Sequence, residues 1–185
     1  MMLFLILAPF AVFGVLMMLT TPAISLFAAA AIAVATIVYD VARGRSVKAL
    51  AAGAAVLFAA IGTYLVLSDG NMGGHGIRLA VDLGVLAIAL GSIALRLPFT
   101  LQYAREVVEP EIIAQPGFMT TNYILTWAWV SAFILMLVAD ILLIYWPSLP
   151  VWIGVGVAFA ARNCAVYFTT WYSARRRAQF AGQAR

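Results

Sequence analysis

Charged residues are scarce in this chain, and their scarcity excludes a water-soluble fold. Only 10% of the 185 residues are charged and 65% are hydrophobic, whereas soluble domains carry roughly 25% charged residues. A soluble fold of this length could not hide so much apolar surface, but in lipid the apolar side chains can face outward. A membrane helix needs ~20 mostly apolar residues to cross ~30 Å of hydrocarbon, so the chain has room for about six.

Cysteine and histidine are also nearly absent, with one of each, Cys164 and His75. One cysteine excludes an intramolecular disulfide, and a single His far from a single Cys argues against a zinc or iron site. His75 falls in a glycine-rich segment, where we expect an exposed loop residue rather than a ligand. We therefore expect no metal and no cofactor. Because no nucleophile, base and ligand set converges in the sequence, we also expect that the protein is not an enzyme.

Long apolar runs predict an all-α, polytopic bundle of six transmembrane helices in a single integral membrane domain, residues 1–185. Lone strands are excluded, because in lipid they would leave backbone groups unpaired. The first run lacks a basic start and a small-x-small cleavage pattern, so we interpret it as a retained helix rather than a signal peptide. The spans are expected at about residues 3–19, 23–38, 49–67, 77–95, 121–146 and 151–171, followed by a basic tail at 173–185.

The longest polar connection lies between spans four and five and has an amphipathic pattern. Phe99, Tyr103 and Val107 fall on one helical face at i, i+4 and i+8. This spacing predicts a short amphipathic helix that rests at the membrane surface and ends at Pro110.

Basic residues fall on one side of a six-span arrangement. Only Arg78 lies in an opposite-side loop. The positive-inside rule makes the basic side cytoplasmic and places both termini there. The net charge of +4 is then mainly a topology signal and does not indicate a nucleic-acid partner, although the run 175–177 could also touch anionic lipid. The nine residues on the basic side are Arg43, Arg45, Lys48, Arg96, Arg105, Arg175, Arg176, Arg177 and Arg185.

Three ionisable residues fall within the spans: Asp82, Asp140 and Arg162. Each would cost ~2.5–3.5 kcal/mol at the bilayer centre on insertion scales, so we expect each to face protein, water or the interface. Asp82 lies near the outer end of span four, where water can reach it. Spans five and six are antiparallel neighbours, which predicts an Asp140–Arg162 pair that Asn163 could join. Such a pair either fixes helix packing or forms part of a polar route for a substrate or proton.

Span five carries a stripe of polar and aromatic residues. Asn122, Thr126, Trp129, Phe133 and Asp140 recur at offsets of four, seven, eleven and eighteen, which is one face of a helix. Lipid would penalise this mixture, so the stripe is predicted to point inward. It serves either as polar packing contacts or as a binding site.

Small residues four apart offer a weaker signal for close helix contacts. The pairs are Ala87-x-x-x-Gly91 and Gly154-x-x-x-Ala158. Because such pairs are frequent, they indicate tight packing only weakly.

Span five contains Ala128-Trp129 followed by Phe133-Ile134-Leu135. In this stretch the chain resembles the intracellular septation protein A family of bacterial inner-membrane proteins, although Thr126 and Asp140 stand where the family tends to have asparagine. The family's proline-led cytoplasmic loop is matched by Pro98 with Gln102 and Pro116, and its basic loop by residues 43–48. In the first helix of this chain, Ala8-Pro9-Phe10 resembles the stretch around a proline in the family's first helix. The resemblance covers most of the chain in layout but only span five in residues.

The resemblance implies a multi-pass protein of the bacterial inner membrane, linked to envelope maintenance and septation through contacts with other envelope or division membrane proteins. It implies no enzymatic activity and leaves the oligomeric state open. The alternative is a small transporter or channel for a lipid or ion that uses Asp82, Asp140 and Arg162. A water-filled cavity that reaches Asp140 and Arg162 would favour transport, whereas a closed pair would favour packing.

Overall fold

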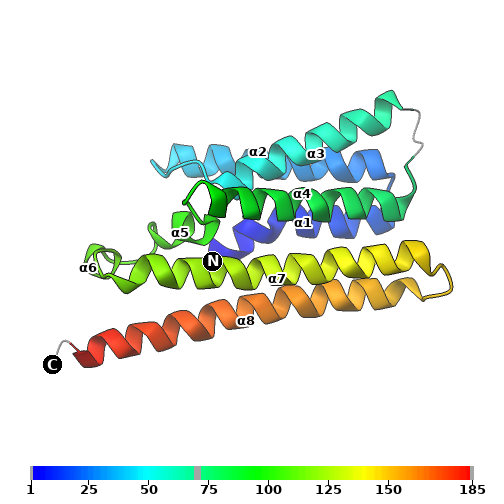
Figure 1. Ribbon diagram of the computed structural model, residues 1–185. Helices are drawn as coiled ribbons and strands as arrows, with labels where there is room; N and C mark the ends of the chain where they lie inside the picture. Colours follow the sequence, from blue (N-terminus) through cyan, green and yellow to red (C-terminus); the bar gives the residue numbers. More distant parts are fainter. Residues whose placement is uncertain (1, 69–71, 184–185) are drawn as a thin grey trace. The chain divides into compact units, whose positions relative to one another are not determined.

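The computed structural model describes residues 2–68 and 72–183, with side chains described for residues 8–68 and 72–179. The described residues form eight helices and no strand, as the apolar runs predict (Figure 1). The helices are α1 (Met2–Leu19), α2 (Pro22–Ala42), α3 (Ala49–Leu67), α4 (Gly74–Ala94), α5 (Phe99–Ala104), α6 (Pro110–Ile113), α7 (Gly117–Tyr145) and α8 (Val151–Gln183).

Five of the described helices are long and apolar enough to cross a membrane: α2, α3, α4, α7 and α8. The predicted helical membrane class is therefore confirmed. Helix α1 is shorter, with 18 residues, and is also apolar throughout.

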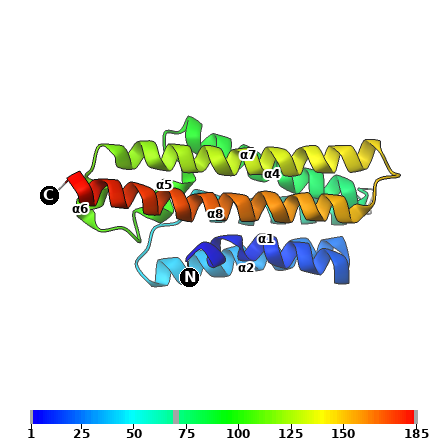
Figure 2. The ribbon, with the colours of Figure 1, turned by 90° about the horizontal axis from the view of Figure 1, so that it is seen from below.

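The chain divides into two units, Met1–Ile88 and Ala89–Arg185, and the division falls inside α4. In the first unit, α2 packs against both α1 and α3 (Figures 1 and 2). Phe58 of α3 is fully buried, and its ring lies 5.4 Å from the rings of Phe10 and of Phe13 on α1. Large aromatic side chains therefore fill the contact between α1 and α3.

Glycines let α3 and α4 approach within the first unit. A Cβ atom at Gly84 would lie 2.6 Å from Cδ2 and 3.0 Å from Cγ of Leu57, and it would overlap Cδ1. A Cβ atom at Gly53 would lie 2.7 Å from Cδ1 of Ile88. Each helix thus inserts a branched side chain over a glycine of the other. The two residue numbers add to 141 in both pairs, as antiparallel neighbours require.

The small-residue pair expected on α4 is not where the close contact occurs. Ala87 is exposed, and a Cβ atom at Gly91 would meet nothing within 4 Å. The prediction for Ala87 and Gly91 is wrong because spacing alone cannot tell which helix face meets a neighbour. On α8 the outcome differs, since a Cβ atom at Gly154 would overlap Cδ1 of Leu143 on α7.

The basic loop after α2 is held by one carboxylate. Asp40 Oδ2 accepts a hydrogen bond from Lys48 Nζ at 2.5 Å, and Asp40 Oδ1 lies 3.5 Å from a guanidinium nitrogen of Arg45. The Lys48 side chain is only 2% exposed. The third basic residue, Arg43, lies 5.0 Å from the ring centre of Tyr39. The loop is therefore a structured turn in which Asp40 offsets part of the positive charge.

In the second unit, α7 and α8 lie side by side as an antiparallel pair joined by the turn at residues 146–150 (Figures 1 and 2). Their register is set by three contacts: Leu143 meets Gly154, Trp129 bonds Thr169, and Thr121 bonds Arg176. The residue numbers add to 297 or 298 in each pair. The two helices therefore keep one alignment over their whole shared length.

Two elements differ from their predicted extent. The residues expected as a basic tail continue α8 without a break to Gln183, because alanine and arginine are strong helix formers. The amphipathic helix is shorter than expected: α5 ends at Ala104, and Val107 lies beyond it with 60% of its surface exposed. Phe99 is buried against α7 rather than at a membrane surface, so the expected Phe99–Tyr103–Val107 face does not form.

Candidate functional site

The polar stripe of α7 faces other protein atoms. Asn122, Thr126, Trp129, Phe133 and Asp140 are all buried. This is the orientation that their spacing predicts, since one face of a helix repeats every 3.6 residues. The stripe spans 18 residues along the helix, or ~27 Å, so its two ends lie at very different depths.

At the N-terminal end of the stripe, two hydroxyl groups and the backbone oxygen of Asn122 form a buried hydrogen-bond cluster. Thr100 on α5 donates its hydroxyl hydrogen to the backbone oxygen of Asn122 at 2.8 Å, and its Oγ1 lies 2.7 Å from Thr126 Oγ1. A hydroxyl has one hydrogen to donate, so Thr126 is the donor of the second bond. Asn122 donates its own amide to the backbone oxygen of Phe118 at 2.8 Å. The cluster anchors α5 on α7.

The α4–α5 connection supports this cluster from the other side. Ser92, near the end of α4, donates its hydroxyl to Ala89 O at 2.6 Å and accepts the backbone N–H of Phe99 at 3.1 Å. These bonds fix where α5 begins, one residue before Thr100.

Further along the stripe, Trp129 connects α7 to α8. Its indole nitrogen donates to Thr169 Oγ1 at 3.1 Å, and its ring lies 6.5 Å from Phe99 and 5.9 Å from Phe133. The side-chain polar atoms of Thr126 and Trp129 both have a partner on a neighbouring helix, which is how packing contacts in a membrane bundle are satisfied.

Asp140 and Arg162 lie on facing helices but not at the same level. Asp140 is 6% exposed and Arg162 is half-buried. The α7–α8 register places Asp140 level with residue 157 or 158, so Arg162 lies four or five residues further along α8, or ~7 Å. An extended arginine side chain spans that distance, so the predicted pair stays a prediction that the register permits. Asn163 is exposed and donates to Phe159 O of its own helix at 2.7 Å.

Asp82 lies deeper along its helix than expected. Helix α4 begins at Gly74 instead of Ile77, so Asp82 is eight residues, or ~12 Å, from the helix start. Its side chain is half-buried. His75, expected in an exposed loop, lies in the first turn of α4 and is also half-buried, because the helix extends into the glycine-rich segment.

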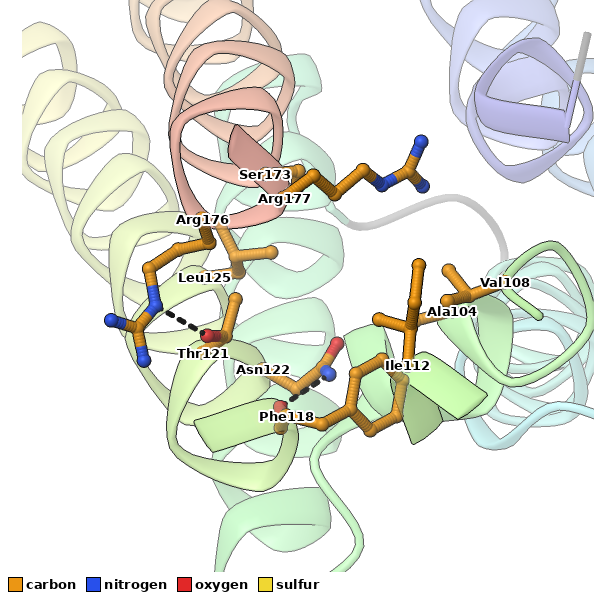
Figure 3. A pocket seen from close by; sticks show the side chains of 10 residues that line it. All are labelled: Ala104, Val108, Ile112, Phe118, Thr121, Asn122, Leu125, Ser173, Arg176 and Arg177. Carbon is orange, nitrogen blue, oxygen red and sulfur yellow. Dashed lines mark hydrogen bonds between the residues drawn. The ribbon is translucent and has the colours of Figure 1, made fainter. Parts of the chain in front are cut away.

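A cavity lies where α5, α6, α7 and the far end of α8 meet within the second unit. It holds about 430 Å³ of empty space, part of it open to the outside. Its walls are mostly apolar, and Figure 3 shows these side chains from close by. The apolar wall consists of Ala104, Val108, Ile112, Phe118 and Leu125.

The polar side chains of the cavity come from α7 and α8. They are Thr121, Asn122, Ser173, Arg176 and Arg177. Arg176 donates from Nε to Thr121 Oγ1 at 3.3 Å, and Figure 3 shows its guanidinium turned away from Arg177. Arg177 is exposed and makes no hydrogen bond or ion pair with any described residue.

The cavity also contains an unusual buried acceptor. Asn122 is 2% exposed, and its Oδ1 has no hydrogen-bond partner among the described residues. Figure 3 shows the amide nitrogen turned to Phe118 and the oxygen turned toward the space between Leu125 and Ile112. A buried acceptor without a donor costs about 1–3 kcal/mol, so a donor from a bound molecule would stabilise this site.

Sequence reasoning identified Asn122, Thr126 and Trp129 but missed their partners. Thr100 and Thr169 were not singled out, although both are polar residues within or next to apolar runs. Their position opposite α7 depends on the α5 turn and on the α7–α8 register, which no short-range pattern encodes. Arg176 and Arg177 fall in the predicted basic tail, and their place beside Asn122 follows only because α8 continues.

The structure offers no metal centre within the part of the chain it describes, because no three His, Cys, Asp or Glu side chains lie close enough to share an ion. Comparisons of the chain with protein-family models, with curated proteins and with solved structures find no match.

Proposed function

We propose that this chain is a six-span inner-membrane protein that supports the bacterial cell envelope or septation through non-enzymatic contacts with other membrane proteins. The supporting observation is that α7 has a buried polar face and an exposed apolar face. Its polar stripe is buried, and Thr126 and Trp129 bond to neighbouring helices of the second unit, while Trp127, Ile134, Leu135 and Val138 are exposed. A helix whose polar side chains pack inside its own unit presents an apolar face to lipid or to a partner helix.

Partner contact is tested with a photo-crosslinking amino acid placed on α7 in native membranes. At Trp127 and Leu135, which are exposed, we expect crosslinks to a defined set of envelope or division proteins. At Val130, which is fully buried, we expect none. Labelling of lipid alone from both exposed positions would contradict the proposal.

The six-span topology requires α1 to cross the membrane. Its 18 residues extend over ~27 Å, close to the ~30 Å hydrocarbon thickness. With α1 counted, both termini and the basic loop after α2 lie on the cytoplasmic side.

Topology is tested by thiol labelling from outside intact spheroplasts, in a Cys164→Ser background that removes the exposed native cysteine. Asn71, the natural position for an outer probe, lies outside the described residues. Gly73 is exposed and has open space around it. A Gly73→Cys variant should react and a Ser46→Cys variant should not. The reverse pattern would overturn the orientation, and labelling of both would overturn the six-span count.

Transport of a lipid or ion is the second candidate, and the buried carboxylate of Asp140 is the observation that favours it. Together with Arg162 of the same unit it would line a polar route. A water route to this level would let an impermeant thiol reagent modify an Asp140→Cys variant in the Cys164→Ser background. Modification would favour transport, while protection would favour the packing interpretation.

A further inference from the structure

The depth of the cavity places it at a lipid headgroup layer. The turn at residues 146–150 marks one end of the α7–α8 pair. Hydrocarbon ~30 Å thick takes up ~20 residues of each helix, so the opposite boundary falls near Leu125 on α7 and near Trp171 on α8. Tryptophan and tyrosine prefer this interface, and Trp171 is followed by Tyr172. The cavity begins at Leu125 and extends to Arg177, so it lies in the headgroup layer with one edge at the acyl chains.

The cavity offers apolar and polar groups side by side. Leu125 lies at the hydrocarbon boundary, and Phe118, Val108 and Ile112 add apolar surface. Arg177 stands at the exposed rim as a cation with no partner among the described residues. The buried Oδ1 of Asn122, three residues from Leu125, points into the same space without a donor among the described residues. A complementary ligand therefore has an apolar part, an anionic group and a hydrogen-bond donor, in that combination.

We infer that this cavity binds an anionic phospholipid whose headgroup carries hydroxyl donors, with Arg177 contacting the phosphate and Asn122 Oδ1 accepting a headgroup hydroxyl. The start of an acyl chain lies against Leu125, where the hydrocarbon begins. Phosphatidylglycerol has this chemistry. The inference needs only that α7 and α8 cross the membrane, and it does not depend on the partner contacts proposed above.

Two residues are expected to set two separate preferences among headgroups. Phosphatidylglycerol carries a net negative charge, whereas phosphatidylethanolamine and phosphatidylcholine are zwitterionic, so Arg177 favours the first over the other two. Phosphatidylethanolamine has N–H donors and phosphatidylcholine has neither N–H nor O–H, so Asn122 discriminates against phosphatidylcholine. One surface cation changes the affinity about fivefold, and one buried hydrogen bond changes it about two- to tenfold.

The test is lipid titration of the full-length protein in detergent, with the affinity for each of the three lipids read by native mass spectrometry. The wild-type order should be phosphatidylglycerol, then phosphatidylethanolamine, then phosphatidylcholine. Arg177→Gln should remove the preference for phosphatidylglycerol over phosphatidylethanolamine and keep the preference for phosphatidylethanolamine over phosphatidylcholine. Asn122→Leu should do the reverse. The matched control is Arg175→Gln, which makes the same charge change two residues away, where the guanidinium stacks 5.5 Å from the Trp171 ring and does not line the cavity.

Several outcomes would overturn the inference. Equal affinities for the three lipids would exclude a headgroup site, and an equal loss with Arg175→Gln and Arg177→Gln would indicate only a charged surface. If Asn122→Leu fails to fold, Val108→Trp fills the cavity from the α5–α6 connection and leaves Asn122 and Arg177 in place. That variant should lower phosphatidylglycerol affinity at least fivefold, and unchanged affinity would refute binding in the cavity.

The apolar part of the ligand is tested by competition. Glycerophosphoglycerol has the same phosphodiester and headgroup hydroxyls but no acyl chain, so it should not displace phosphatidylglycerol at equal concentration. Displacement would identify a soluble phosphate ester as the ligand and would overturn the assignment to lipid.

Discussion

Replacing Gly84 by alanine tests whether the α3–α4 contact depends on the absence of a side chain. The added Cβ atom would lie 2.6 Å from Cδ2 and 3.0 Å from Cγ of Leu57 and would overlap Cδ1. Carbon atoms make favourable contact at about 3.5–4.0 Å, so the Leu57 side chain would have to retreat by about 1 Å. Because its branch carbon and both methyl groups are involved, rotation of one methyl group cannot relieve the overlap.

The expected magnitude comes from two opposing effects. Alanine gains up to about 1 kcal/mol over glycine in a helix interior, whereas overpacking a close contact costs about 1–3 kcal/mol. Gly91→Ala on the same helix keeps the first effect without the second, because nothing lies within 4 Å of its added Cβ atom. Gly84→Ala should therefore be about 1–3 kcal/mol less stable than Gly91→Ala.

The assay is unfolding in mixed micelles titrated with sodium dodecyl sulfate. All five tryptophans follow residue 126 and so lie in the second unit. Fluorescence would therefore miss changes in the first unit, so helicity is followed by circular dichroism. In a Leu57→Ala background the overlapping atoms are gone, and Gly84→Ala should then match Gly91→Ala. Equal stability of the two alanine variants in the wild-type background would refute the proposed contact.

Three further contacts are tested with variants in the same unfolding assay. Trp129→Phe removes the indole bond to α8 and some buried volume, and should cost about 1–3 kcal/mol, whereas Trp127→Phe on the exposed face should stay within about 0.5 kcal/mol of wild type. Asp40→Asn leaves the buried Lys48 ammonium without its carboxylate and should cost about 3 kcal/mol, which a second Lys48→Met change should largely restore; equal stability of single and double variants would contradict the ion pair. Thr100→Val keeps the shape but removes the hydroxyl that links α5 to α7, and should cost about 1–2 kcal/mol; an unchanged midpoint would show that α5 is held by apolar packing alone.

The length of the apolar runs predicted the helices, and the helical period of the polar stripe predicted the inward face of α7. Apolar runs bounded by Pro22, Gly44 and the 147–150 turn mark helix ends, because proline and glycine interrupt helices there. The α7 stripe was predictable because one helical period fixes its members' direction without reference to any other element. Both signals are local, and both follow from the constraint that lipid places on backbone and polar groups.

Helix ends and helix partners depend on information that the local pattern lacks. The fall in hydrophobicity predicts that the last span ends near Trp171. The helix itself continues to Gln183, because charged residues do not interrupt a helix in water. Spacing likewise favoured Gly91 as a contact point, while Gly84 makes the contact. Which face of a helix meets its neighbour follows from tertiary packing, and small residues recur on several faces of α4.

The position of Asn122 connects these two kinds of information. Its direction follows from the α7 period, yet its surroundings exist only because α8 continues past the hydrocarbon boundary and α5 turns back onto α7. Deeper along the stripe, Thr126 and Trp129 receive partners from α5 and α8, as residues surrounded by lipid require. At the boundary, the oxygen of Asn122 has none among the described residues. A partner supplied from outside the chain fits this place, because lipid headgroups bring donors to the depth at which the helices no longer supply them.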